Sequence, residues 1–257
     1  MKLTFATLFS GSSGNAAYIR AGEDAILIDA GKSCRYIENC LREIGADMSK
    51  VRAVFVTHEH IDHIQALPVL RKKYNLPVYI PADCRGGHPC LPEDALYYDG
   101  LCDLTVGPFR VRSFYTPHDS FGAMGYTVEV FGKKIGVATD MGLLATSVVE
   151  ALSGCDAALV ECNYDEDMLT NGSYSAWLKA RIAGEGGHLS NSDGALLAAV
   201  LASGGTGRIL LGHMSAENNT PEKVNEAVKR EFEKRGVSAY TLVADREKPT
   251  VLLEEDI

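Results

Sequence analysis

The sequence predicts an α/β (α+β) protein in which two β-sheets pack together with helices outside both. Two observations support this prediction: each half of the chain shows short β-rich runs followed by segments of helical spacing, and no linker or shift in composition separates the halves. The 257 residues are 46% hydrophobic and 23% charged, which is typical of a globular protein. A chain of this length can bury roughly 75% of its unfolded surface. We therefore expect one domain over residues 1–257.

The first half predicts an antiparallel meander and then alternating helices and strands. We expect the meander strands at 3–8, 16–20 and 25–29, with a turn at 10–15. Apolar residues at helical spacing, with Ser33 as N-cap, predict a helix that ends at Gly45. The following elements are a buried strand at 53–56, a helix that ends at 74, a strand at 78–80 and a loop-rich stretch at 83–100.

The second half repeats this order of strands and then helices. Strand-rich segments are expected at 104–111, 126–130 and 134–138, with later strands at 157–160 and 208–211. Helical spacing predicts helices at 146–152, 173–182, 193–201 and 221–235.

The charge and cysteine content narrow the class of protein. A formal charge of −9 argues against a protein that coats DNA or an anionic bilayer through a broad basic surface. This charge does not exclude an enzyme that acts on nucleic acid, because bound cations would add positive charge at the active site. Seven irregularly spaced cysteines, no secretion signal and no run of 18 apolar residues predict a cytoplasmic protein without a membrane span. The sequence does not predict an oligomeric state.

The strongest chemical signal is Thr-His-Glu-His-Ile-Asp-His at 57–63, directly after an apolar strand. Random placement of residues would give HxHxDH with a probability of about 3 in 10,000. His58 and His60 should point to one side of the strand end, and the next helix should return Asp62 and His63 to the same space. Imidazole and carboxylate ligands together favour zinc, manganese or iron over calcium or magnesium.

Further metal ligands are expected elsewhere in the chain. Four clustered ligands cannot all serve one tetrahedral ion that also keeps a position open for water. His118, Asp140 and His213 each follow an apolar strand. Each alone could be a core histidine or a capping aspartate, but their shared position at strand ends favours metal binding.

These motifs together resemble those of the metallo-β-lactamase fold metallohydrolases, and the resemblance runs the length of the chain. It implies a four-layer αββα sandwich with two divalent metal ions (zinc, manganese or iron) between the sheets. It implies that Asp140 bridges the two metals and that Asp29, in Leu-Ile-Asp-Ala-Gly at 27–31, braces the ligands. The remaining implied ligands are His58, His60 and His118 for the first metal, and Asp62, His63 and His213 for the second.

A narrower resemblance is carried by Gly-His-Leu-Ser-Asn at 187–191. This segment is similar to the nuclease and phosphodiesterase side of the superfamily, in which a histidine here contacts the scissile phosphate. With the 10–15 turn, Glu-Cys-Asn at 161–163 and the segment 215–221, it resembles the WalJ/YycJ branch, whose characterised members are DNA exonucleases. The chain departs from that branch at Tyr164, where a histidine is usual.

We therefore expect a hydrolase of phosphodiester bonds that acts on nucleic acid, with a DNA exonuclease as the leading interpretation. Two cations would bind a bridging hydroxide, which Asp62 and Asp140 would orient. His188 would stabilise the transition state or protonate the leaving oxygen. The turn residues expected to bind substrate phosphate are Ser12, Ser13 and Asn15, although a plain tight turn is the alternative.

Other readings remain open at this point. The enzyme could instead hydrolyse a small cyclic phosphodiester, or attack the carbonyl of a thioester or lactam. A third hypothesis is a protein that keeps the fold but binds a partner without catalysis. Trp177, near Lys179 and Arg181, fits either base stacking or core packing. The basic run 71–73 favours a solvated helix face. Ordinary cysteines are favoured over a second zinc site at Cys84, His88, Cys90 and Cys102.

Overall fold

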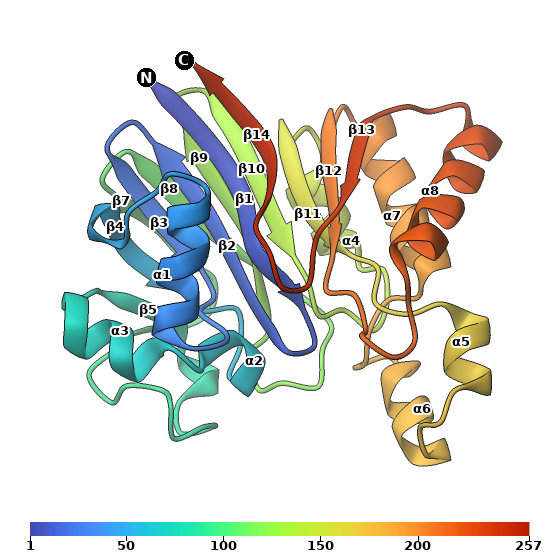
Figure 1. Cartoon of the computed structure of the whole chain (residues 1–257), viewed down its shortest axis with the longest axis horizontal. Helices are drawn as coiled ribbons and strands as arrows, with labels where there is room; N and C mark the ends of the chain where they lie inside the picture. Colours follow the sequence, from blue (N-terminus) through green and yellow to red (C-terminus); the bar gives the residue numbers. More distant parts are fainter. Residues whose placement is uncertain (257) are drawn as a thin grey trace.

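The computed structural model describes residues 1–256, whose strands form two seven-stranded sheets packed against each other (Figure 1). The first sheet has the order β14-β1-β2-β3-β4-β5-β6. Its strands are β1 (Lys2–Gly11), β2 (Gly14–Ala21), β3 (Asp24–Ile28), β4 (Val51–Phe55), β5 (Val78–Pro81), β6 (Leu96–Tyr98) and β14 (Thr250–Asp256). The second sheet has the order β13-β12-β11-β10-β9-β8-β7. Its strands are β7 (Asp103–Val106), β8 (Phe109–Tyr115), β9 (Met124–Val130), β10 (Lys133–Ala138), β11 (Ala157–Glu161), β12 (Arg208–Gly212) and β13 (Tyr240–Val243).

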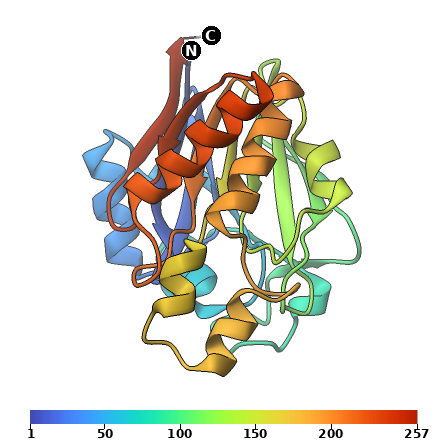
Figure 2. The ribbon, with the colours of Figure 1, turned by 90° about the vertical axis from the view of Figure 1, so that its right-hand side faces the viewer.

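Helices cover the outer faces of both sheets, so the chain has the four layers αββα that the sequence predicts. The helices beside the first sheet are α1 (Cys34–Glu43), α2 (Ile61–Ile64) and α3 (Leu67–Tyr74) (Figure 1). Those on the second sheet are α4 (Thr146–Leu152), α7 (Asn191–Ser203) and α8 (Pro221–Arg235). Figure 2 shows α7 and α8 side by side, and two short helices at the lower end of the molecule, α5 (Glu166–Asn171) and α6 (Ala176–Ile182).

The core has three layers of buried side chains, as this architecture requires. Between the sheets, Phe5 and Phe55 from the first sheet and Phe109 and Tyr126 from the second are fully buried in one cluster. Two further clusters lie between each sheet and its helices. Successive side chains of a strand point to opposite faces, so the nearly continuous burial along β1, β2 and β11 means that both faces of each sheet are covered.

The structure differs from the sequence prediction at several elements. The segment expected to be one helix at 173–182 starts only at Ala176, where Ser175 accepts a hydrogen bond from the Leu178 N–H as N-cap. Two strands near the C-terminus, β13 and β14, were not predicted, and β6 lies in the expected loop. All three are edge strands of their sheets. Because they are only partly buried, they lack a clear apolar run.

Two findings concern the surroundings of the protein. Each of the seven cysteines is a free thiol, as the irregular spacing predicts. None of the helices formed by residues 1–256 combines the length and the apolar character that crossing a bilayer requires.

Candidate metal centre

The candidate site lies at one end of the sandwich, where several strands finish. Parallel pairing of β3 with β4, and of β10, β11 and β12, brings the residues that follow these strands together. Asp29, Asp140 and His213 stand at such strand ends with left-handed backbone conformations, at φ values of 66°, 60° and 54°. A left-handed conformation costs a non-glycine residue about 1–2 kcal/mol. Such cost concentrated at one place is typical of a functional site.

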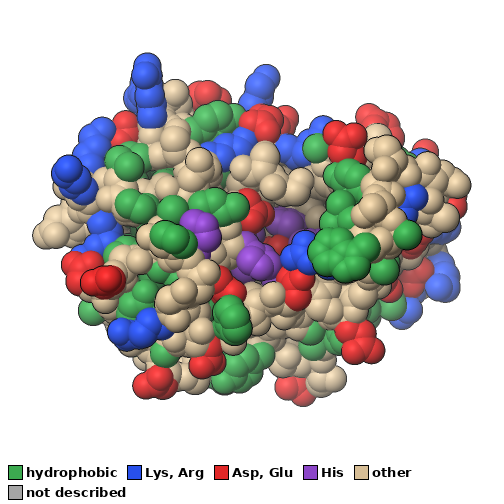
Figure 3. Space-filling model, turned by 90° about the horizontal axis from the view of Figure 1, so that it is seen from below, with side chains coloured by type: hydrophobic (Ala, Val, Ile, Leu, Met, Phe, Trp, Pro, Cys, Tyr) green, Lys and Arg blue, Asp and Glu red, His purple; other side chains and the backbone are tan. Residues whose placement is uncertain are grey.

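The structure brings together every residue that the sequence singled out as a metal ligand. Their nitrogen and oxygen atoms form groups in which all members lie within 4.8 Å of one another. Three of these groups are His58, His60 and His118; Asp62, His63 and His213; and His58, His63 and Asp140. Figure 3 views this end of the molecule and shows the histidines gathered in a hollow.

The first group has the spacing of a tetrahedral site. His60 Nδ1 lies 3.2 Å from His118 Nε2. Two nitrogens bound to one zinc ion at about 2.0–2.1 Å in tetrahedral geometry are roughly 3.3 Å apart. The observed separation therefore fits a shared cation, with His60 binding through Nδ1.

Asp140 lies between the two groups of ligands. Its Oδ2 is 3.3 Å from His63 Nε2, and its Oδ1 is 3.2 Å from His213 Nε2 and 3.8 Å from His118 Nε2. Asp62 Oδ2 completes the second group at 3.5 Å from His63 Nε2 and 3.7 Å from His213 Nε2. A carboxylate in the position of Asp140 can reach cations on both sides of it.

Four of the rings are oriented by a hydrogen bond at Nδ1, which leaves Nε2 directed at the centre. In metal sites such a partner fixes the tautomer and the ring plane. The pairs are His58 with Thr57 Oγ1 (3.0 Å), His63 with Asp29 Oδ2 (2.7 Å), His118 with the Gly187 carbonyl (3.0 Å) and His213 with Glu161 Oε1 (3.0 Å). Asp29 is itself fixed by the N–H and Oγ1 of Thr57, at 2.8 and 2.9 Å. Asp29 thus lies behind the ligands, with its carboxylate on the Nδ1 of His63.

Three polar atoms at this centre are buried and lack a hydrogen-bond partner among the described residues: His58 Nε2, Asp140 Oδ2 and His213 Nε2. A buried polar atom without a partner costs free energy, so native structures rarely contain one. Three of them within the overlapping ligand groups indicate that these residues bind a further group. The mixture of imidazole nitrogens and carboxylate oxygens fits zinc, manganese or iron.

The charges of the centre are strongly coupled. Burial lowers the pKa of His58 well below its ordinary value. Burial would also lower the pKa of His63 and His213, but neighbouring carboxylates, Asp140 foremost, raise the pKa of His63 well above its ordinary value and that of His213 to about 10. Burial would raise the pKa of Asp140, but the surrounding histidines lower it well below its ordinary value. The carboxylates therefore stay ionised and demand positive charge from whatever lies beside them.

His188 lies beside the ligand groups and is held by Glu161. Its Nδ1 is 2.8 Å from Glu161 Oε1 and 3.8 Å from Asp140 Oδ1, and its ring stacks on that of His213 with centroids 5.2 Å apart. The His188 side chain is 17% exposed, whereas Glu161 is fully buried. His188 thus faces the hollow while its other side is anchored.

The turn at 10–15 borders the second group of ligands. Ser12 and Ser13 are exposed, and Ser13 Oγ donates to Glu247. Asn15 differs from the expected substrate-facing amide: its side chain is buried, bonds to the backbone of Gly11, and lies 3.1 Å from His63 Nε2. Through these contacts Asn15 fixes the turn against the ligands.

The sequence analysis noted the segments 10–15 and 161–163 but assigned no role to several of their residues that shape the centre. Glu161 joins His188 and His213, Asn163 Nδ2 donates to the carbonyl of His213, and Ser10 Oγ accepts from the His213 N–H at 2.8 Å. A buried acid at the end of the apolar strand β11 was a usable signal for Glu161. Tyr164 is buried, and its carbonyl accepts from the N–H of Asn191 at 2.7 Å, which anchors the start of α7.

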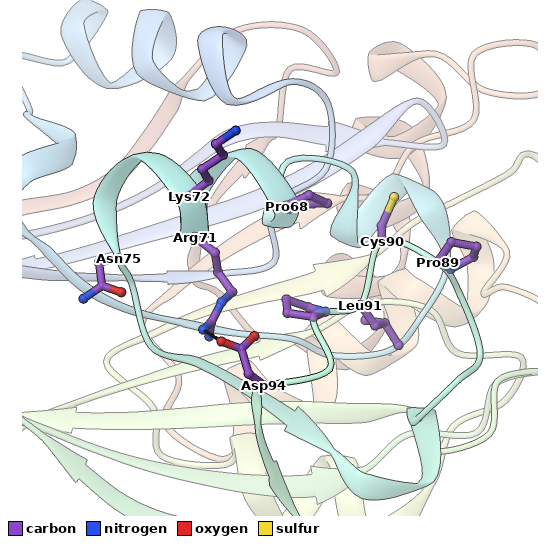
Figure 4. Close-up of a pocket in the computed structure, with 9 residues that line it drawn as sticks. Pro68, Arg71, Lys72, Asn75, Pro89, Cys90, Leu91 and Asp94 are labelled. Atoms are coloured by element: carbon purple, nitrogen blue, oxygen red, sulfur yellow. Dashed lines mark hydrogen bonds and ion pairs between the residues drawn. The ribbon is translucent and has the colours of Figure 1, made fainter.

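A separate surface pocket of about 470 Å³ lies between α3 and the segment 89–94 (Figure 4). Arg71 forms an ion pair with Asp94 across it. Nearby, His88 Nδ1 accepts from the N–H of Cys90 at 3.1 Å. The polar groups of this region are thus engaged with each other, and the metal-binding groups found among the described residues contain none of Cys84, His88, Cys90 and Cys102.

Comparison with known proteins shows where this chain belongs. Residues 24–214 match the Beta-lactamase superfamily domain. The chain is 34% identical over 241 residues to Exodeoxyribonuclease YycJ of Bacillus anthracis, covering 92% of this chain and 91% of that protein. It is 33% identical over 226 residues to Exodeoxyribonuclease WalJ of Streptococcus pneumoniae, covering 85% and 84%. Among solved structures, the metallo-beta-lactamase fold protein YhfI from Bacillus subtilis superposes with a TM-score of 0.72 at 16% identity, covering 97% and 99%.

A four-layer sandwich with histidine and aspartate groups between strand ends defines a metallo-hydrolase, and these matches agree with that class. The chain belongs to the beta-lactamase superfamily and is an enzyme with the metallo-β-lactamase fold.

Proposed function

We propose that this enzyme is a metal-dependent exodeoxyribonuclease with two divalent ions, zinc, manganese or iron, in the centre. The observation that carries the proposal is the His188–Glu161 pair beside both ligand groups, because it offers a proton donor at the centre. His188 and Glu161 also form a fourth candidate metal-binding group with Asp140 and His213, so the test must measure bound metal as well as activity. The names of YycJ and WalJ support DNA as the substrate.

In this proposal His58, His60 and His118 hold one ion, Asp62, His63 and His213 hold the other, and Asp140 reaches both. Such a pair of ions lowers the pKa of water and stabilises negative charge on phosphate oxygens. Asp62 and Asp140 orient the attacking water by accepting its hydrogen bonds. Asp29 and Glu161 hold the ligand rings in place from behind.

His188 acts on the substrate in this proposal. Glu161 accepts the Nδ1–H of His188 and thereby aims Nε2 at the scissile phosphate. From there Nε2 stabilises the charge that develops on a phosphate oxygen, or in its protonated form donates a proton to the leaving oxygen. Ser12 and Ser13, exposed on the neighbouring turn, offer hydroxyls and backbone N–H groups to a second phosphate of the strand.

The test compares wild type with His188→Ala after loading with zinc or manganese. The substrates are an end-labelled single-stranded DNA and bis-(p-nitrophenyl) phosphate, and bound metal is measured by mass spectrometry. We expect stepwise shortening of the DNA by wild type, and a loss of about 100-fold or more in His188→Ala with both metals retained. His88→Ala, a histidine variant outside the centre, serves as the matched control.

Other outcomes would redirect the assignment. Loss of metal in His188→Ala would make His188 a ligand and contradict its role at the phosphate. Hydrolysis of the small diester alone would replace DNA with a small cyclic phosphodiester. Hydrolysis of a thioester or lactam, with neither phosphodiester cleaved, would overturn the proposal.

A further inference from the structure

Two aromatic side chains stand out from the molecular surface at the metal cleft. Among the large apolar side chains of residues 1–256, Phe121 and Trp177 have the greatest exposure, 76% and 73%. Exposed aromatic rings of this size beside a cleft are candidates for contact with a ligand. The exposure of Trp177 also excludes the core packing that its helical spacing allowed.

Phe121 is fixed to the segment that carries the first ligands. It lies three residues after His118, and its N–H donates to Glu59 Oε1 at 3.3 Å. Glu59, which stands between His58 and His60, also accepts from Ser120 Oγ at 2.7 Å through Oε2. These bonds hold the 119–122 loop at the edge of the metal centre and leave the ring of Phe121 in solvent.

Trp177 is tied to the same edge through α6. Arg181, four residues later and on the same face of the helix, donates from Nε to Asp119 Oδ2 at 2.7 Å. The other oxygen, Oδ1, lies 3.4 Å from His118 Nε2. The N–H of Asp119 also donates to the carbonyl of Gly186 at 2.9 Å. Trp177 is therefore about one helical turn, roughly 6 Å of rise, from Arg181, which contacts Asp119 at the edge of the centre.

The rim of the cleft and its floor differ in chemistry. Ile61 and Leu143, next to Asp62 and close to Asp140 in the chain, are also exposed, at 45% and 38%. Figure 3 shows hydrophobic side chains on either side of the histidines. A ligand that fits both parts has charged groups for the floor and flat apolar faces for the rim. A nucleotide strand has this combination.

We infer that Phe121 and Trp177 form a stacking platform for nucleobases of the strand whose phosphate lies in the metal centre. The inference rests on the proposed nuclease function and adds a substrate form to it. Bases inside a duplex are covered on both faces, whereas unpaired bases at a single-stranded or frayed end can each turn a free face to an aromatic ring. The platform therefore selects unpaired ends that carry bases, whatever their sequence.

The first test uses fluorescence, because Trp177 is the one tryptophan in the chain. The metal-loaded wild-type enzyme is titrated with a ten-nucleotide phosphorothioate strand, which resists hydrolysis, and with an abasic strand of the same backbone and length. We expect the base-containing strand to quench the emission and the abasic strand to leave it nearly unchanged. Equal responses to the two strands would overturn the inference.

The second test measures hydrolysis of end-labelled natural and abasic strands. We expect wild type to prefer the natural strand by about 10-fold or more, since stacking on one ring contributes roughly 5- to 150-fold to affinity. Trp177→Leu and Phe121→Leu should lose most of this preference through a higher KM, whereas Trp177→Phe, which keeps a ring, should retain it. Tyr240→Ala is the matched control, because Tyr240 is exposed and pairs with Arg208 at the far end of β12 from His213.

The outcomes separate the two proposals. If wild type cleaves both strands equally well, the stacking platform is wrong and the nuclease function stands. If wild type cleaves neither strand, the nuclease function fails. In that case, quenching of Trp177 emission by the base-containing strand alone would still support a nucleobase platform. Without such quenching, the stacking proposal would fail together with the nuclease function.

Discussion

Glu161 supports His188 from the buried side of the cleft, with Oε1 2.8 Å from Nδ1 of the ring. Its other oxygen accepts from the N–H of Met141 at 2.7 Å. In both contacts the Glu161 oxygen is the acceptor. Glu161→Gln should therefore place an N–H₂ group against the N–H of His188 or of Met141 and loosen the His188 ring. We expect kcat on DNA to fall about 10- to 100-fold, the usual effect of losing a partner behind a working histidine. Glu166→Gln, at an exposed position in α5, should match wild type.

His60 is the ligand whose loss should disturb the fold least. Its side chain is 30% exposed, whereas the other histidines of the centre are nearly or fully buried. His60→Ala should therefore lose turnover and metal from the first group while keeping the circular dichroism spectrum of wild type. Full activity in this variant would contradict the ligand assignment.

Removal of metal should destabilise the enzyme. Asp62 and Asp140 lie at the centre as ionised carboxylates, and a cation that binds only the folded state stabilises it by about 2.7 kcal/mol at 100 times its Kd. We expect a chelator to lower the Tm and added zinc or manganese to restore it. A Tm that is the same with and without chelator would argue against resident metals.

Glu38 should make stability depend on pH at a place remote from the centre. The hydrogen bond from Lys73, followed by those from Tyr74 and Cys34, lowers the pKa of Glu38 to about 2, against the opposing effect of burial. Because the folded pKa is below the ordinary value of 4.5, the ionised group stabilises the protein above about pH 4.5. This stabilisation is lost as the pH falls from there towards 2.

Glu38→Gln should therefore cost about 1 kcal/mol at pH 7 and progressively less below pH 4.5. The measurement is urea denaturation of both proteins between pH 3 and 7. Glu43→Gln, at an exposed position of the same helix, controls for the loss of one surface charge. A difference for Glu38→Gln that stays constant over this range would disprove the role of its ionisation.

We propose that residues 1–257 form one folding unit, because the cluster between the sheets takes its side chains from both halves of the chain. Phe109 is fully buried in that cluster. Phe109→Ala should lower the free energy of unfolding by roughly 3–5 kcal/mol and keep a single transition. Coincident curves from circular dichroism and from Trp177 emission would support one unit, and separated curves would indicate two.

Sequence reasoning reached the fold, and it named the candidate ligands that the structure brings together, because their signals are local. HxHxDH stands within six residues, and His118, Asp140 and His213 each follow an apolar strand. The supporting contacts depend on distant segments and could not be predicted in this way. Ser10 Oγ and the His213 N–H, for example, are 203 residues apart in sequence.

The same reason explains the other differences. Strand β14 pairs with β1 at the opposite end of the chain, and its partial burial gave no local pattern. Asn15 was expected to face substrate because the small side chains and backbone N–H groups of the turn suit a phosphate, but its amide lies against His63 instead. A sequence identifies candidates for a site more readily than the inward or outward aim of each one.

The left-handed conformations of Asp29, Asp140 and His213 restrict which replacements the enzyme can survive. The left-handed backbone at these three positions strongly disfavours the β-branched residues valine, isoleucine and threonine. Asparagine tolerates this conformation, so Asp140→Asn should give a folded protein that lacks the negative charge of this carboxylate. Such a protein would be a natural choice for trapping an uncleaved strand in crystals. The strained backbone of the centre thus also indicates which substitution should inactivate the enzyme without unfolding it.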